Sequence, residues 1–293
     1  MDFRSLIKSN RPVLLDGAMG TELMKRGLEP SGLVNLSHRE AVKDIHRDYF
    51  RAGSDAVLTN TFTANRIYLE THGLDCDVDA VNRTGVKAAK EVCPKGKYVL
   101  GDLGTTGQLL EPLSNYTEEQ FYLNFKEQAR ILWESGVDGF IIETQTDLRE
   151  ALCALRACKD LCDLPVIVSF AFSRTPKGFA TMMGNFLKDC AGQAAAQGAD
   201  VIGANCGDLE PLDMQEIVAE IRSITRLPII VQPNAGKPQL LGGVTSYNMS
   251  PELFSAGIAK CIEAGAQLVG GCCGTTFEHI QRVGKLIEEI YGS

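Results

Sequence analysis

The sequence predicts an α/β protein of the (β/α)₈ barrel class, on three observations. Eight short runs rich in β-branched residues recur along the 293 residues, separated by segments with helical periodicity. The runs are continuously apolar rather than alternating, which is typical of parallel strands buried on both faces. A similar tripeptide precedes every second run, and a barrel usually needs about 250 residues. We therefore expect one barrel domain spanning residues 1–293.

The expected strands follow one another from the N-terminus, at residues 13–16, 56–60, 98–102, 139–143, 165–170, 201–206, 228–234 and 268–273. The tripeptides that precede the even-numbered strands are Gly53-Ser54-Asp55, Gly136-Val137-Asp138, Gly198-Ala199-Asp200 and Gly265-Ala266-Gln267. Glycine suits the left-handed residue that ends a helix, so a helix is expected to stop at each tripeptide. An open doubly wound sheet is the alternative, but no Gly-x-Gly-x-x-Gly turn follows the first strand.

Three long connections follow odd-numbered strands, at residues 105–118, 175–188 and 236–249. In a barrel these segments lie at the C-terminal ends of the strands. Active sites of barrel enzymes are built there, so we look for the site at this face.

Composition narrows the class of protein. Hydrophobic residues make up 44% and charged residues 23%, as in ordinary globular proteins, and the net charge of −8 argues against nucleic-acid or anionic-membrane partners. The first residues lead into no apolar signal segment, and no stretch is apolar enough to span a bilayer, so we expect a cytoplasmic protein. The ten cysteines are then expected to be reduced thiols, a few of them chemically employed.

An adjacent cysteine pair, Cys272 and Cys273, ends the last expected strand between glycines. Side chains alternate between the faces of a strand, so both thiols serve one site only where this alternation breaks. Cys206 ends the sixth strand, and the inward side chains of alternate barrel strands share layers. We therefore expect the three thiols to converge, the alternative being that the adjacent pair is simply buried.

Three thiolates with a fourth position open form the ligand set of a catalytic zinc site. Such a complex carries a net charge of about −1, which makes it a poor Lewis acid for generating hydroxide. A thiol substrate bound as the fourth ligand stays deprotonated yet nucleophilic. We therefore expect Cys206, Cys272 and Cys273 to bind zinc that activates a thiol.

Polar residues end other expected strands at the same edge: Asp16, Asn60 with Thr61, Asp102, Glu143, Asn205 and Asn234. Glu143 follows a very apolar run, so its charge needs a partner. The loop through Asp16, Gly17 and Ala18 offers main-chain amides for a carboxylate, while Asp16 or Glu143 can pair with an ammonium. Capping of the following helix is the alternative role of Asp16.

The sequence gives less support to two other barrel functions, a histidine-based hydrolase and a phosphate-binding enzyme. The histidines His38, His46, His72 and His279 end no expected strand, which disfavours a histidine-based hydrolase. We expect His46, in a helical run, to pack against neighbours or lie on the surface. Gly242 and Gly243 near Lys237 allow a phosphate-binding loop, although Gly-Gly pairs are common in turns.

The chain resembles the zinc-dependent homocysteine S-methyltransferases, and most of all the homocysteine-binding module of cobalamin-dependent methionine synthase. The resemblance runs nearly end to end, and the late Cys-Cys motif with the upstream cysteine is its most specific part. The matching segments are Asp16-Gly17-Ala18-Met19-Gly20-Thr21, Thr59-Asn60-Thr61-Phe62, Gly101-Asp102-Leu103-Gly104, Glu143-Thr144-Gln145-Thr146-Asp147, Gly203-Ala204-Asn205-Cys206, Pro233-Asn234-Ala235-Gly236 and Gly271-Cys272-Cys273-Gly274-Thr275.

The resemblance implies a barrel enzyme that binds zinc and methylates homocysteine to methionine. Residue by residue, the zinc ligands of the family fall on Cys206, Cys272 and Cys273, and its amino-acid-binding positions fall on Asp16, Gly17, Ala18 and Glu143. Asn234 matches a position that fills the open zinc site until homocysteine arrives. The folate and cobalamin modules of the full synthase are not found in these 293 residues, so the methyl donor stays open.

Three residues bear on the methyl donor. Betaine-using relatives need an aromatic enclosure for a quaternary ammonium, whereas the only tryptophan, Trp133, falls in a helical run with the spacing of a packed face. The loop after the second strand offers one aromatic residue, Phe62. Relatives that use methylated sulfonium donors commonly carry arginine after the cysteine pair, where this chain has Gly274.

We therefore expect methylcobalamin as the donor, either free or carried by a corrinoid protein that docks around the zinc. A homocysteine methyltransferase that uses S-methylmethionine, S-adenosylmethionine or betaine is the first alternative. Transfer to another thiol or selenol is the second. A non-catalytic zinc-binding barrel is the third, and it would require a fourth protein ligand.

Overall fold

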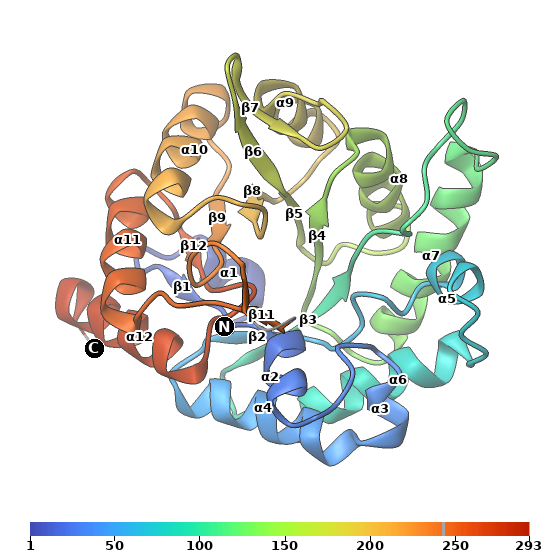
Figure 1. Cartoon of the computed structure of the whole chain (residues 1–293), viewed down its shortest axis with the longest axis horizontal. Helices are drawn as coiled ribbons and strands as arrows, with labels where there is room; N and C mark the ends of the chain where they lie inside the picture. Colours follow the sequence, from blue (N-terminus) through green and yellow to red (C-terminus); the bar gives the residue numbers. More distant parts are fainter. Residues whose placement is uncertain (242–243, 293) are drawn as a thin grey trace.

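The computed structural model describes residues 1–241 and 244–292, and it contains the predicted barrel. Eight parallel strands form one sheet in the order β1-β12-β9-β8-β5-β4-β3-β2, and the helices form a ring around them (Figure 1). The strands are β1 (Val13–Leu14), β2 (Ala56–Leu58), β3 (Tyr98–Leu103), β4 (Gly139–Gln145), β5 (Val166–Phe170), β8 (Val201–Asn205), β9 (Ile229–Gln232) and β12 (Leu268–Val269). All eight strand predictions are confirmed.

The first and second strands meet and nearly close the sheet. The main-chain N–H of Asp55, just before β2, donates to the carbonyl of Leu14 in β1 at 2.6 Å. An open doubly wound sheet would leave these strands apart, so that alternative is wrong.

The helices connect the strands and cover the outside of the barrel. They are α1 (Phe3–Ile7), α2 (Met19–Lys25), α3 (Val34–Ser37), α4 (Arg39–Arg51), α5 (Arg66–Thr71), α6 (Val78–Lys90), α7 (Glu118–Glu134), α8 (Leu148–Lys159), α9 (Leu187–Ala196), α10 (Pro211–Ile224), α11 (Pro251–Glu263) and α12 (Phe277–Tyr291). Within residues 1–241 and 244–292, none of these helices combines the length and apolar composition needed to cross a membrane.

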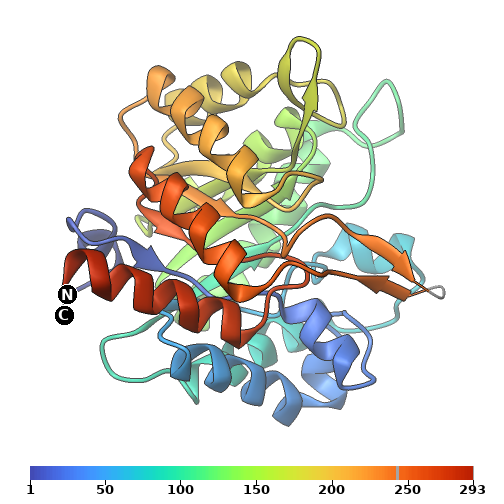
Figure 2. The same cartoon turned by 60° about the vertical axis from the view of Figure 1, so that its left-hand side comes forward.

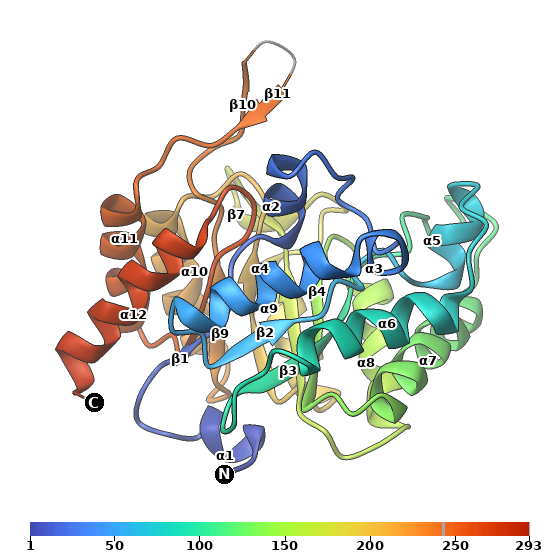
Figure 3. The same cartoon turned by 90° about the horizontal axis from the view of Figure 1, so that it is seen from below.

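Two of the three long connections contain β-hairpins. After β5, β6 (Phe172–Thr175) pairs with β7 (Gly178–Thr181), and after β9, β10 (Gln239–Leu241) pairs with β11 (Val244–Ser246). The β10–β11 hairpin extends beside α2 and away from the barrel (Figure 2), on the face opposite α1 (Figure 3). Gly242 and Gly243, which allowed a phosphate-binding loop, lie outside the described residues.

Apolar side chains fill the barrel interior and the layer between strands and helices. The interior layer takes one or two residues from every strand: Val13, Leu15, Ala56, Leu58, Tyr98, Leu100, Ile141, Ile167, Val201, Ile230 and Leu268. Phe3 and Ile7 of α1 belong to the same cluster and close the N-terminal end of the barrel. The barrel is therefore a packed core, and ligands have access only from the C-terminal end.

The four tripeptides tie strands together at the N-terminal end. Their glycines Gly53, Gly136, Gly198 and Gly265 have φ of 112°, 88°, 89° and 111°, the left-handed conformation that was expected. The third residue of each tripeptide accepts a hydrogen bond from the preceding strand: Asp55 from Leu14 N, Asp138 from Val99 N, Asp200 from Val166 N and Gln267 from Ile229 N, at 2.7–3.0 Å. Each repeat therefore fixes the strand before it against the strand after it.

Candidate functional site

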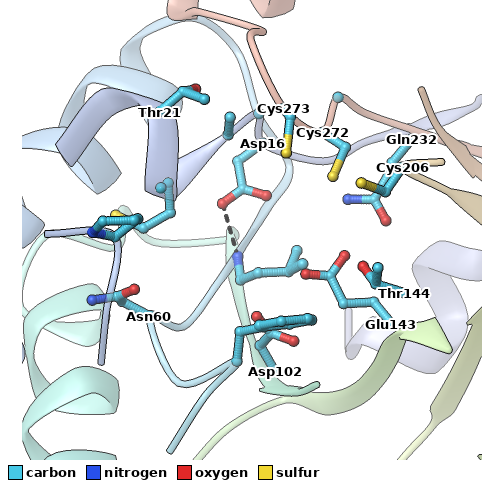
Figure 4. A pocket seen from close by; sticks show the side chains of 18 of the residues that line it. Asp16, Thr21, Asn60, Asp102, Glu143, Thr144, Cys206, Gln232, Cys272 and Cys273 are labelled. Carbon is cyan, nitrogen blue, oxygen red and sulfur yellow. Dashed lines mark hydrogen bonds between the residues drawn. The ribbon is translucent and has the colours of Figure 1, made fainter. Parts of the chain in front are cut away.

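A cavity of about 270 Å³ lies at the C-terminal ends of the strands. It brings together every expected zinc ligand and substrate-binding residue except Asn234: Asp16, Gly17, Ala18, Glu143, Cys206, Cys272 and Cys273. Figure 4 shows the sulfur atoms and the carboxyl groups facing the same space. The cavity is the candidate functional site.

The three cysteines converge although they come from two strands. Their Sγ atoms all lie within 4.8 Å of one another, close enough to hold a metal ion. A tetrahedral zinc with bonds of about 2.3 Å separates its sulfur ligands by about 3.8 Å, which this cluster can accommodate. Cys206 directly follows β8 and has φ of 56°, a conformation that non-glycine residues rarely adopt. The backbone therefore leaves the regular strand conformation at Cys206. For the adjacent pair, where the break in alternation was predicted, β12 ends at Val269, so Cys272 and Cys273 lie beyond the regular strand.

The thiols also polarise one another without a metal. Hydrogen bonds from Cys206 and Cys272 lower the pKa of Cys273, against the effect of burial. The pKa of Cys272 is raised, because its proton is held by Cys206 and Cys273 and because it is buried. The cluster therefore already favours a thiolate at Cys273.

The cysteine pair is fastened to the first loop through Thr275. Its Oγ1 accepts a hydrogen bond from Ala18 N at 3.0 Å and donates to the carbonyl of Cys272 at 2.7 Å. A Cβ on Gly17 would lie 2.7 Å from that Oγ1, and a Cβ on Gly271 only 2.5 Å. These two glycines are required by close packing, which keeps the first loop and the cysteines in register.

Asp16 faces the cavity and does not cap a helix. It is buried, and its Oδ2 accepts a hydrogen bond from Leu58 N at 2.9 Å (Figure 4). The N-cap residue of α2 is Ala18, which has no side-chain cap. Burial raises the pKa of Asp16, the Leu58 N–H opposes this, and Glu143 raises the pKa further. The capping alternative is therefore wrong.

Two more carboxyls, Asp102 and Glu143, line the same cavity. Burial, with the charge of Cys273, raises the pKa of Glu143 to about 7, and a hydrogen bond with Asp102 opposes that rise. Burial and the nearby Glu143 and Asp16 raise the pKa of Asp102. Among the described lining residues there is no lysine, arginine or histidine. Two buried carboxyls, Asp16 and Asp102, and the half-buried Glu143 therefore share one cavity without a basic partner, an arrangement that can accommodate a cation.

Asn205, which the sequence indicated only as a polar residue at this edge, and Gln232, which it did not single out, also belong to the site. Asn205 contacts both Glu143 and Cys272, and Gln232 lines the cavity with its buried Oε1 unpaired. The alternation of side chains along a strand could have indicated that both residues point into the barrel. Val201 and Ile230 point into the barrel, so residues two or four positions later on the same strands point inward too.

Asn234 follows β9 but is not among the described residues that line the cavity. Its Nδ2 donates to the carbonyl of Gly207 at 2.8 Å, while its Oδ1 is buried and unpaired. It is therefore held next to Cys206 with a free acceptor atom.

Two aromatic residues have positions that the sequence did not indicate. Tyr247, which follows β11, packs on Gly274: a Cβ there would lie 2.2 Å from the Tyr247 ring. Gly274 directly follows Cys273, so the Tyr247 ring lies beside the cysteine pair, and burial with the charge of Cys273 raises the pKa of Tyr247. No spacing in the sequence pointed to this contact.

The expectation that Trp133 is packed is wrong, because it is 43% exposed on α7, outside the buried face of that helix.

Comparison with known proteins identifies the family. The sequence model of the homocysteine S-methyltransferase family matches residues 13–287. The chain is 30% identical over 306 residues to methionine synthase of Mycobacterium tuberculosis, covering 97% of this chain and 25% of that protein. The corresponding values for methionine synthase of Mycobacterium leprae are 30% over 301 residues, 95% and 24%. The chain thus spans about a quarter of the length of these relatives.

Solved structures show the same fold. The metallated form of the homocysteine methyltransferase MmuM from Escherichia coli superposes with a TM-score of 0.79 at 23% identity, covering 97% of this chain and 99% of that one. Its oxidised form gives a TM-score of 0.78 at 23% identity, with 97% and 98% covered. Together with the family match over nearly the whole chain, the barrel and its cysteine cluster lead to one conclusion: this protein belongs to the homocysteine S-methyltransferase family.

Proposed function

We propose that the chain methylates homocysteine to methionine, with the homocysteine sulfur bound to zinc. The observation that carries this proposal is the joint placement of a three-thiol cluster and three carboxyls, those of Asp16, Asp102 and Glu143, in one cavity. A thiol that also carries an ammonium group matches both halves of that cavity. Family membership supports the same reaction.

The thiol cluster fits zinc better than a hard cation, because thiolates are soft ligands and their sulfur atoms converge. Cys206, Cys272 and Cys273 would hold the ion, which when bound keeps the homocysteine thiol deprotonated near neutral pH. The unpaired Oδ1 of Asn234 is our candidate for the fourth ligand in the absence of substrate.

The residues of the chain position the amino acid. Glu143 is proposed to accept hydrogen bonds from the ammonium group, and Asp16 lies on the same side of the cavity, where a bound ammonium favours its ionised form. Main-chain amides of the loop at Gly17 and Ala18 are proposed to bind the substrate carboxylate. In the transfer itself the sulfur forms a bond to the methyl carbon while the bond between methyl and donor breaks, and that electron pair stays with the donor. Catalysis rests on alignment of sulfur and methyl.

We propose methylcobalamin as the donor, presented by a corrinoid protein. Phe62 is the one aromatic residue among the described lining residues, and Tyr247 lies beside the cysteines; these two rings are too few to enclose a quaternary ammonium. Leu212, Leu253 and Phe277 are 61%, 67% and 42% exposed at the N-terminal ends of α10, α11 and α12. α10 and α12 follow β8 and β12, and α11 follows the hairpin after β9, so these N-terminal ends lie at the C-terminal face of the barrel, and we propose that their exposed side chains contact the partner.

The experiment that tests the function is methionine formation from homocysteine by the zinc-loaded protein, with each donor supplied separately. Methylcobalamin should support transfer, and loss of the methyl–cobalt absorbance should equal the methionine formed. Turnover with S-methylmethionine, S-adenosylmethionine or betaine and none with methylcobalamin would overturn the donor only. Absence of methionine with every donor, together with no binding of homocysteine, would contradict the proposed function.

A further inference from the structure

Asn205 connects the two halves of the site. It is the last residue of β8 and is fully buried. Its Nδ2 donates to Glu143 Oε2 at 3.0 Å and lies 3.9 Å from Cys272 Sγ. One amide group therefore touches both the carboxylate proposed to bind the ammonium and a sulfur proposed to bind zinc.

The orientation of this amide is fixed by its other end. Oδ1 accepts hydrogen bonds from the main-chain N–H of Thr144 at 2.8 Å and from the Ser169 hydroxyl at 2.7 Å. A main-chain N–H can only donate, so the oxygen must lie on this side and the nitrogen must face Glu143 and Cys272. The amide cannot turn without leaving the Thr144 N–H unpaired inside the protein.

Asn205 also supports the backbone beside each group. Thr144, which follows Glu143, and Cys206, which follows Asn205, both have φ of 56°. Such conformations persist in non-glycine residues only where neighbouring contacts hold them. The Thr144 N–H and the Thr144 Oγ1, at 2.7 Å from Nδ2, both bond to Asn205, so one side chain holds the ends of β4 and β8 together.

We propose that Asn205 is a positioning residue that fixes the separation between the Glu143 carboxylate and the metal-binding sulfur of Cys272. This inference rests on the proposed function, since it concerns an amino acid held by its ammonium group and its thiol. A fixed separation selects homocysteine, whose thiol is on Cγ, over cysteine, which is one methylene shorter. One methylene is worth about 10- to 200-fold in a site of defined size.

The test measures binding of L-homocysteine and L-cysteine to the zinc-loaded full chain by calorimetry. Asn205→Ala should bind homocysteine at least about tenfold more weakly, since it loses a hydrogen bond to a charged group. Its preference for homocysteine over cysteine should fall about tenfold or more, while its zinc content stays at that of the wild type. Cobalt-substituted protein gives a second readout, because the thiolate-to-cobalt absorption reports directly whether each thiol reaches the metal.

Two further variants keep the test decisive. Asn205→Asp keeps the size of the side chain and the acceptor for Thr144 and Ser169 but replaces the donor, so it should fold and show the same loss of preference. Asn124→Ala is the matched control. Asn124 is a buried asparagine of α7 that bonds to Ile67 N and Asn65, away from the cavity, and its removal should leave the preference unchanged.

The outcomes separate this inference from the function on which it rests. A wild-type protein that prefers homocysteine, with both Asn205 variants losing that preference, supports the proposal. An unchanged preference in folded, zinc-containing Asn205 variants overturns it, as does loss of zinc from them, which would make Asn205 a metal-site residue. If the wild type binds no homocysteine, the proposed function itself is wrong.

Discussion

At the scale of single residues, the site depends on side chains at the points where strands end. Asp102, Glu143 and Asn205 stand two or four positions after interior residues of their own strands. Cys206 directly follows the inward-pointing Asn205, so in a regular strand its side chain would point outward. Its backbone is left-handed instead, and its side chain lines the same cavity. Strand ends thus provide both regular and irregular positions, and the chemistry uses both.

The first prediction at this scale concerns the metal. Cys206→Ser, Cys272→Ser and Cys273→Ser should each lose most of the bound zinc and remain folded, because the packed core lies below the site. Zinc content by elemental analysis checks this, with circular dichroism for the fold. Cys261→Ser is the control: this thiol is buried in α11 and bonds to Pro211 O at 3.2 Å. Full zinc and activity in any of the three would remove that cysteine from the ligand set.

The second prediction concerns the ammonium group. Glu143→Gln keeps the shape of the side chain but removes its charge, so homocysteine affinity should fall about ten- to a hundredfold while zinc stays bound. Glu150→Gln is a matched control, because burial also raises the pKa of Glu150 to about 7 although it lies in α8 and bonds to Thr106 N at 2.6 Å. Equal affinities of Glu143→Gln and wild type for homocysteine would assign Glu143 a structural role.

At the scale of elements, the four tripeptides divide the barrel into pairs of strands. Each pair is tied at the N-terminal end by a glycine that ends a helix and by a side chain that bonds to the preceding strand. The opposite ends of the strands carry the site. This separation lets one end supply stability while the other carries strained and charged residues.

Asp55→Ala tests this division. The variant removes the hydrogen bonds that the Asp55 carboxylate accepts from Leu14 N at 3.0 Å and from Lys97 Nζ at 2.8 Å, and it leaves the buried Leu14 N–H unpaired. We expect a loss of about 3 kcal/mol in the free energy of unfolding. Homocysteine affinity of the folded variant should not change. Urea unfolding and calorimetry measure the two quantities.

Glu263→Ala is the comparison for that measurement. Glu263 pairs with Lys260 at 2.7 Å on the exposed side of α11, where an ion pair contributes about 0–1 kcal/mol. If the two variants lose equal stability, the tripeptide bonds do not tie the strands in the way described.

At the scale of the whole molecule, the fold carries a buried histidine that limits its stability in acid. His46 is fully buried in α4 with both ring nitrogens unpaired, and burial lowers its pKa from 6.5 to about 3. Between these values the folded chain keeps His46 neutral, whereas the unfolded chain binds a proton. The unfolded state therefore gains protons as pH falls, and folding is destabilised.

We predict that His46 contributes a loss of about 1.4 kcal/mol per pH unit in the free energy of unfolding once the pH is well below 6.5. His46→Leu removes this group and keeps the position apolar, so its stability should fall less between pH 7 and pH 5 than that of the wild type. Urea unfolding at several pH values checks the difference. If stability falls equally with pH in the two proteins, the pKa of His46 is the same in the folded and unfolded states, and the prediction is wrong.

Much of the fold and part of the site were predictable because they depend on local patterns. Continuous apolar runs and glycine-ended helices specify strands and helices from short segments, and those gave the eight strands correctly. The convergence of Cys206 with Cys272 and Cys273 followed from barrel geometry. The two hairpins, the exposure of Trp133 and the contact of Tyr247 with Gly274 depend on neighbours distant in the sequence, which local patterns do not contain.

The sequence by itself determined the barrel, the thiol cluster and the edge at which polar residues gather, because strand periodicity and strand order follow from the chain alone. Only the tertiary structure decided how those groups work together. It showed that Asp16 faces the cavity rather than a helix end and that Asp102 lines the same cavity as Glu143. It also placed Asn205 between a carboxylate and a sulfur. Such roles depend on angles and distances of a few ångströms between strands, which packing of the whole barrel sets and no single segment encodes.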